Sequence, residues 1–223
     1  MGFARVLALG DRIMRSCIVA IAAFALVAAG PQDKDKPTSK DKGKQAAAEK
    51  GGLEPGNELP GPFQPYNVNG RFKGRFHCLV CQHGLNPTVA VFVRGTDDLE
   101  GVGALLQGLE AALKTKKNEK ARLGGFAIFV DELVADVVGN DEKREQTAAK
   151  LEDLAAKLDR VTIALASKAD LEKYRLSPDA DVEIVLYDKL KVVAVKREAK
   201  AKLTKEGVPA LVNEIVSKLV GKS

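Results

Sequence analysis

Two cysteines three positions apart, Cys78 and Cys81, are the residues of this chain best suited to chemistry. They stand in the sequence F-H-C-L-V-C-Q-H-G, with His77 and His83 on either side. A C-x-x-C pair can cycle between dithiol and disulfide, because a thiolate that attacks one sulfur leaves the other thiol positioned to resolve the mixed disulfide. The histidines could act as bases or, when charged, lower the pKa of a thiol.

Two other interpretations of the same residues stay open. The cysteines could be inert, as a structural disulfide or as two small buried side chains, since Cys is commonly buried for packing alone. Together with His77 and His83 they could also bind copper(I) or zinc, which suit sulfur and imidazole ligands. Haem attachment would need C-x-x-C-H, and Gln82 stands in the place of that histidine.

The backbone of this segment decides whether the two sulfurs can meet. In a regular strand Cys78 and Cys81 would point to opposite faces and lie about 10 Å apart. A disulfide needs Cα atoms about 4.4–6.8 Å apart, so redox cycling requires a turn or the start of a helix here. The following Q-H-G-L-N-P favours a turn, although one that begins about one residue too late.

The N-terminus has the pattern of a secretory signal. Residues 17–29 are an uncharged apolar run that follows Arg12 and Arg15, and small residues precede a cleavage site after Ala29. The run is shorter than the roughly 20 residues of a membrane span, so we expect no span in the mature chain, with an uncleaved anchor as the alternative. Translation could start at Met1 or at Met14. The sequence therefore predicts export to the periplasm or the extracellular space, where a cysteine pair is oxidised.

A linker over residues 30–65 is expected to follow the signal. Residues 30–51 have almost no large apolar side chain and should be disordered, and a proline-rich and glycine-rich lead-in follows them. The formal net charge of the chain is +5, but residues 1–50 carry +4 of it and the remainder only +1. A nearly neutral domain has no electrostatic footprint for a phosphate backbone, so we expect no nucleic-acid partner.

Residues 66–221 have the pattern of one α/β domain. Continuous apolar runs predict buried strands, and apolar residues at helical spacing predict the helices between them. Asp97 and Glu100 form a predicted capping pair for the first of these helices. No G-x-G-x-x-G or P-loop motif is present, and we expect no cofactor. The predicted elements are a hairpin within 66–81 that turns at Asn69-Gly70, strands at 88–93, 125–130 and 161–166, helices at 97–113, 141–158 and 171–176, a hairpin of 182–187 with 191–195, and a last helix at 208–219.

This order of elements resembles the redoxin branch of the thioredoxin-like superfamily, which contains peroxiredoxins and exported thiol–disulfide oxidoreductases. The matching segments are V-A-V-F-V-R (89–94), A-I-F-V-D-E (127–132) and V-E-I-V-L-Y-D-K-L-K-V-V (182–193). The resemblance implies a central mixed sheet with helices on both faces, closed by a C-terminal β-hairpin and helix. It also implies protein thiols or disulfides as partners. Cys78 and Cys81 are the candidate reactive pair because of their own C-x-x-C spacing, and they precede the first core strand.

Two departures from the family pattern leave the activity open. The family places its reactive cysteine after the first core strand, where this chain reads R-G-T-D-D at 94–98. The family also has a cis-proline before the closing hairpin, where this chain has Val182, and Pro178 lies four residues too early. A peroxidatic role is therefore not expected. The two remaining hypotheses are an exported thiol–disulfide oxidoreductase and a non-enzymatic thioredoxin-fold binding module whose cysteines are structural or metal-binding.

Overall fold

The structure is a computed structural model that describes residues 52–130 and 140–221. The predicted signal peptide and the predicted disordered part of the linker lie outside the described residues. Within the two described ranges, no helix is both long enough and apolar enough to cross a membrane.

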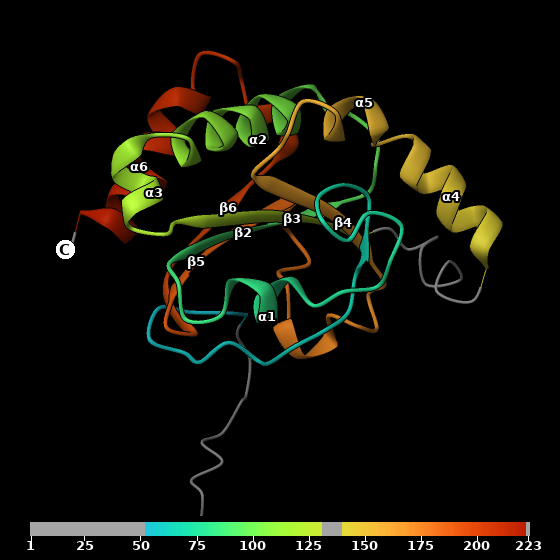
Figure 1. The fold of residues 1–223 in the computed structure, drawn as a ribbon, viewed down its shortest axis with the longest axis horizontal. Helices are drawn as coiled ribbons and strands as arrows, with labels where there is room; N and C mark the ends of the chain where they lie inside the picture. Colours follow the sequence, from blue (N-terminus) through green and yellow to red (C-terminus); the bar gives the residue numbers. More distant parts are fainter. Residues whose placement is uncertain (1–51, 131–139, 222–223) are drawn as a thin grey trace, which may run out of the picture. The chain divides into compact units, whose positions relative to one another are not determined.

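Six strands form one mixed sheet in the order β1-β4-β3-β2-β5-β6 (Figure 1). The three strands β4, β3 and β2 are parallel, and β5, β6 and β1 are antiparallel additions at the two sides. The parallel strands are buried on both faces, which is why they read as continuous apolar runs. The strands are β1 (Tyr66–Asn67), β2 (Thr88–Arg94), β3 (Gly124–Val130), β4 (Val161–Ala166), β5 (Val182–Asp188) and β6 (Lys191–Glu198).

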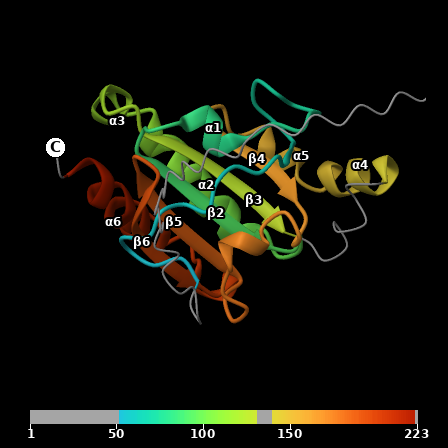
Figure 2. The ribbon, with the colours of Figure 1, turned by 90° about the horizontal axis from the view of Figure 1, so that it is seen from below.

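Helices cover both faces of this sheet. In Figure 1, α2 and α6 lie above the sheet and α1 lies below it, and the view from below in Figure 2 has α1 on the near side. The α-helices are α1 (Leu79–His83), α2 (Glu100–Leu113), α3 (Lys116–Lys120), α4 (Asp141–Ala149), α5 (Glu152–Ala155) and α6 (Val208–Val220). Two short 3₁₀ helices are η2 (Glu172–Tyr174) and η3 (Lys200–Lys202).

The alternation of side chains along β2 divides the core into two clusters. Val89, Val91 and Val93 belong to the cluster that α2 and α6 cover, because successive strand residues point to opposite faces. Ala90 and Phe92 belong to the cluster on the face of α1. The first face is closed by regular helices, whereas the second is closed by α1, η2 and irregular segments.

The element order and the α/β architecture predicted from the sequence are confirmed, but three of the predicted helices differ. The helix predicted at 141–158 is broken into α4 and α5, and the break lets Leu151 and Leu154 enter the core while α4 stays largely polar. The predicted Asp97 cap is wrong, since α2 begins at Glu100 with Leu99 as its N-cap and no side-chain cap. The helix predicted at 171–176 is only the single turn η2.

The predicted hairpin within 66–81 is also wrong for most of its length. Tyr66 pairs with Phe76 in a single bridge, but Tyr66–Asn67 joins the sheet beside β4. Asn69 does not form a tight turn. Its buried Oδ1 accepts a hydrogen bond from the Ile163 amide at 2.6 Å, and its Nδ2 donates to the Val161 carbonyl at 3.1 Å. Asn69 thereby fastens this loop to β4.

The lead-in before β1 is irregular but packed. Leu53 and Phe63 are buried in the cluster on the face of α1. The Tyr174 hydroxyl donates to the Gly61 carbonyl at 2.7 Å, and Glu58 forms a β-bridge with Lys191. The packed part of the chain therefore begins earlier than residue 66, because these apolar side chains complete the second face of the core.

Candidate active site

Cys78 and Cys81 meet at the first turn of α1. Cys78 is the N-cap of this helix, with φ −75° and ψ 108°, and helical backbone starts at Leu79. The Cα atoms of the two cysteines lie 5.3 Å apart, and their sulfurs form a disulfide. The segment is not extended, so the geometric condition for redox cycling set by the C-x-x-C spacing is met.

The two cysteines differ in their access to solvent. Cys78 is buried, with 8% of its surface exposed, whereas Cys81 is exposed. The Cys78 Sγ also accepts a hydrogen bond from the Cys81 backbone amide at 3.0 Å. A reagent from solution therefore reaches the second cysteine of the motif first, and the first cysteine already has a hydrogen-bond donor.

Two apolar side chains between the cysteines anchor α1 to the sheet. Leu79 and Val80 are buried and belong to the same cluster as Ala90 and Phe126. The helix ends at Gly84, which has φ 57° and whose amide donates to the Val80 carbonyl at 3.0 Å. A glycine suits this end because an L side chain rarely adopts a positive φ. A helix of five residues is held here by its packing, since so short a helix is not stable alone.

His83 lies at the end of α1 and packs on the sheet. Its ring stacks on Phe126 with ring centroids 5.6 Å apart, and its buried Nε2 has no hydrogen-bond partner among the described residues. Burial lowers the pKa of His83 to about 4, because desolvation penalises the charged imidazolium. The ring is therefore neutral at neutral pH and brings no positive charge to a nearby thiolate.

His77 lies immediately before the disulfide and makes a different contact. Its ring stacks on Phe72 with centroids 3.6 Å apart, and its backbone amide donates to the Pro65 carbonyl at 3.1 Å. Within the described ranges, no group of three or more His, Cys, Asp and Glu side chains is arranged to hold a metal ion. The structure thus brings Cys78 and Cys81 together but does not gather them with both histidines into a ligand set.

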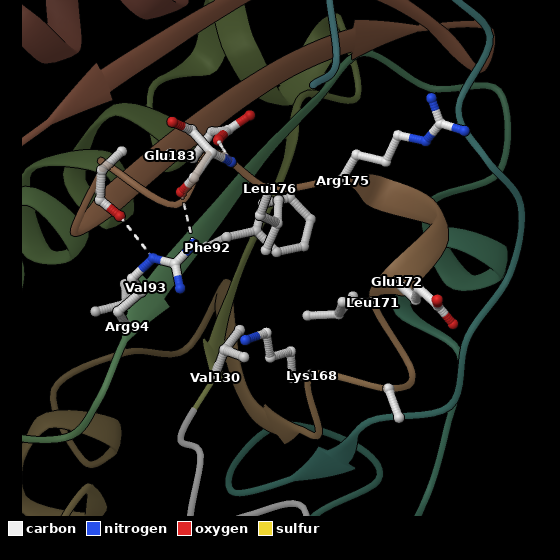
Figure 3. A pocket seen from close by; sticks show the side chains of 13 residues that line it. Phe92, Val93, Arg94, Val130, Lys168, Leu171, Glu172, Arg175, Leu176 and Glu183 are labelled. Atoms are coloured by element: carbon white, nitrogen blue, oxygen red, sulfur yellow. Dashed lines mark hydrogen bonds between the residues drawn. The ribbon is translucent and has the colours of Figure 1, made fainter. Parts of the chain in front are cut away.

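The opposite end of β2 holds a cavity that the sequence did not indicate. Here the family pattern would place a reactive cysteine, and this chain has Arg94-Gly95-Thr96 instead. The cavity has a volume of about 560 Å³ and is lined by residues of β2, β3 and β5 and of the segment after β4 (Figure 3). One signal was present in the sequence: Glu183 places a charge inside the apolar run V-E-I-V-L-Y, and it is buried at this cavity.

The chain was also compared with known proteins. No family model and no curated protein matches it. Among solved structures it is similar to a thiol:disulfide interchange protein from Bacteroides sp., with 18% identity, 76% of this chain and 91% of that chain covered, and a TM-score of 0.49. It is also similar to the thioredoxin domain of a thiol-disulfide oxidoreductase from Bacteroides vulgatus, with 15% identity, 74% of this chain and 99% of that chain covered, and a TM-score of 0.48. Its similarity to yeast Sco1 with copper bound has 16% identity, covers 72% of this chain and 94% of that chain, and has a TM-score of 0.42.

The fold class follows from the chain's own sheet. Three parallel strands in the order β4-β3-β2 continue into the antiparallel hairpin of β5 and β6, and α6 closes the domain. This is the thioredoxin-like architecture, with the redoxin order of elements that the sequence predicts. At identities of 14–18% the likeness to solved structures concerns the fold alone.

Proposed function

We propose that this chain is an exported thiol–disulfide oxidoreductase and that Cys78 and Cys81 are its reactive pair. The observation that supports this function best is the position of the disulfide, which lies at the start of a surface helix with one of its two cysteines exposed. A disulfide that only stabilises the fold has no need of such access. Export is proposed from the apolar run at 17–29 and the predicted cleavage after Ala29.

The exchange reaction has two steps. A thiolate of the partner attacks the Cys81 Sγ, a new disulfide forms between the partner and Cys81, and the Cys78–Cys81 bond breaks to leave a thiolate on Cys78. A second partner thiolate then attacks the partner sulfur of this mixed disulfide and releases Cys81 as a thiolate. Two electrons pass to the protein, and the two partner thiols become one disulfide. In the opposite direction the dithiol reduces a disulfide of the partner.

The hydrogen bond at the N-cap favours Cys78 as the leaving group. The Cys81 amide lies 3.0 Å from the Cys78 Sγ and stays close when the disulfide opens, because both belong to the same turn. A hydrogen bond to the charged form of a group stabilises that form, and a more stable thiolate leaves faster. We therefore assign first attack to the exposed Cys81 and the resolving role to the buried Cys78.

Apolar side chains beside α1 suit a protein partner. Phe76, Leu85 and Leu190 are the exposed large apolar residues within the described ranges, and the first two flank α1 on its N-terminal and C-terminal sides. The Lys189 amide donates to the Leu85 carbonyl at 3.3 Å, so the turn that carries Leu190 lies next to Leu85. Apolar groups around a reactive sulfur can contact an unfolded or extended substrate chain.

Insulin reduction by the full protein with a dithiol as reductant tests the function. We expect the wild type to accelerate insulin precipitation and Cys78→Ser and Cys81→Ser to fall to the background rate, with Arg160→Gln as a surface control at the wild-type rate. The order of attack is tested separately by the rate at which each single-cysteine variant reacts with an aromatic disulfide reagent. Cys78→Ser, which keeps the exposed thiol, should react at least about tenfold faster than Cys81→Ser, since the thiol must be reached from solution.

These results separate the alternatives. If the wild type reduces insulin but Cys81→Ser reacts faster with the disulfide reagent than Cys78→Ser, the oxidoreductase function stands and the order of attack is reversed. An inactive wild type with the Arg160→Gln control equally inactive would make the disulfide structural and overturn the function. Export is tested by the mass of the secreted protein, which should begin at residue 30; a product that retains the first 29 residues would contradict it.

A further inference from the structure

The cavity at the C-terminal end of β2 has the form of a small-molecule site. Its volume of about 560 Å³ lies within the range of about 300–1,000 Å³ that is common for ligand pockets. Its walls come from the last residues of β2 and β3, the first residues of β5, and the segment that contains η2. In Figure 3, side chains from these separate parts of the chain surround one space.

The middle of the cavity is apolar. Phe92 of β2 and Val130 of β3 form its floor on the sheet, and Leu171, Leu176 and Ala180 line it from the following segments. Phe92 and Leu171 are each 3% exposed, so they are fixed by packing on their other sides. Such a lining favours the hydrocarbon or aromatic body of a ligand, because apolar surface is removed from water when it binds.

The acidic residue buried at this cavity is already neutralised. Glu183 accepts a hydrogen bond from the Ser177 amide at 2.8 Å and pairs with the Arg197 guanidinium at 3.3 Å. A second acidic residue, Glu172, is exposed, and Figure 3 shows its carboxylate on the side away from Arg94. Neither carboxylate therefore gives the cavity a negative end.

Arg94 supplies a fixed positive charge at one end of the cavity. Its Nε donates to the Ala180 carbonyl at 2.8 Å and its Nη2 to the Ser177 carbonyl at 2.6 Å, drawn as dashed lines in Figure 3. Both acceptors are uncharged, and in the part of the chain that the structure describes no carboxylate pairs with Arg94. A guanidinium has five N–H groups, so donors remain, and the two carbonyls hold the planar group in one orientation.

We propose that this cavity binds a small carboxylate with an apolar body, and that Arg94 binds the carboxylate group. A half-buried guanidinium that no carboxylate of residues 52–130 and 140–221 pairs with is stabilised by an anion, and a carboxylate matches its fork of donors. The apolar walls hold the rest of the ligand. This site is separate from the disulfide, since α1 precedes the N-terminal end of β2 and the cavity lies at its C-terminal end. Its ligand binding does not depend on the redox function.

Titration calorimetry of the full protein with octanoate, octylammonium and acetate tests the site. Octanoate should bind saturably, octylammonium should not bind because it meets Arg94 with a like charge, and acetate should bind at least about tenfold more weakly because it has no apolar body. Arg94→Gln should weaken octanoate binding at least tenfold. Arg94→Lys should weaken octanoate binding less than Arg94→Gln does, since lysine keeps the positive charge but lacks the forked donors of the guanidinium. Arg160→Gln is the matched control, because the exposed Arg160 guanidinium pairs with Glu119. This variant should bind octanoate like the wild type.

A second variant keeps the test decisive if Arg94→Gln fails to fold. Leu176→Trp places a larger side chain in the apolar part of the cavity and should abolish octanoate binding while Arg94 stays in place. Amide chemical shifts should locate octanoate at Phe92 and Leu171. Equal affinity for octanoate and octylammonium, no saturable binding, or chemical-shift changes confined to residues of α2 and α6 would each overturn the proposal.

Discussion

The two ends of β2 are built on different physical principles. At its N-terminal end the disulfide helix α1 is held by apolar contacts of Leu79 and Val80 and by the stacked, neutral ring of His83. At its C-terminal end, charged groups fix the structure. Arg94 donates hydrogen bonds to two backbone carbonyls, and the buried Glu183 forms an ion pair with Arg197. The family that the chain resembles has its reactive cysteines at the C-terminal end of this strand. In this chain the cysteines precede the N-terminal end of β2.

This difference places the cysteine pair of this chain away from the position at which the family that it resembles has its reactive cysteines. The C-terminal end of the parallel strands keeps a concave site, as open α/β sheets generally do. It lacks a sulfur, and its fixed guanidinium suits ion recognition. The disulfide lies instead on a short helix that a few packing contacts hold. We expect the two ends to respond differently to pH, to charge removal and to added volume.

The largest change in unfolding free energy should appear on acidification, at the N-terminal end of β2, where α1 carries the disulfide. The folded protein lowers the pKa of His83 from 6.5 to about 4, so between these values the unfolded chain binds a proton that the folded chain does not. The folded state is therefore destabilised as the pH falls from 6.5 towards 4, by about 3 kcal/mol in total, and the loss is complete below pH 4. Above pH 6.5 the effect is absent.

Urea unfolding of the wild type and of His83→Gln at pH 7 and pH 4 measures this effect. The variant should lose about 3 kcal/mol less than the wild type over that interval, because its side chain does not titrate. Parallel pH profiles of the two proteins would show that the ring is not buried in its neutral form. Titration of the ring signals by NMR gives the pKa directly.

An intermediate effect is expected at the cavity end, from the buried carboxylate of Glu183. Glu183→Ala removes the acceptor of the Ser177 amide and the partner of Arg197, and should cost about 2 kcal/mol of unfolding free energy. The cost stays below that of a fully buried pair because Arg197 is 38% exposed and can be hydrated.

The matched control for Glu183 is an exposed acidic residue in a similar pair. Glu119 pairs with Arg160 at 2.8 Å, and its side chain is 43% exposed. Glu119→Ala should cost less than about 1 kcal/mol, as exposed ion pairs contribute little. Equal losses for Glu183→Ala and Glu119→Ala in urea unfolding would mean that charge does not hold the C-terminal end of β2.

The sequence predicts the sheet well because each buried strand carries its own signal. The strand at 161–166 agrees with β4 residue for residue, since a continuous apolar run is a local property. The two ends of β2 carry no such signal. The helix α1 has five residues and forms because Leu79 and Val80 are buried, which depends on the rest of the fold. Arg94 and Glu183 are 89 positions apart, and the pairing of β2 with β5 brings both of them to the same cavity.

The smallest effect tests the packing of the disulfide end against β3. A Cβ on Gly124 would overlap the His83 ring, so Gly124→Ala should displace the imidazole and cost about 1–2 kcal/mol. The cost should nearly vanish in a His83→Ala background, because the overlap is then absent, and this double-mutant cycle isolates the contact. Gly125→Ala is the matched control: its Cβ would approach Leu109 and Leu113 on the other face, so its cost should be the same with or without His83. If His83→Ala relieved both substitutions equally, the ring would not be the group that requires glycine at position 124, and the apolar account of this end of β2 would fail.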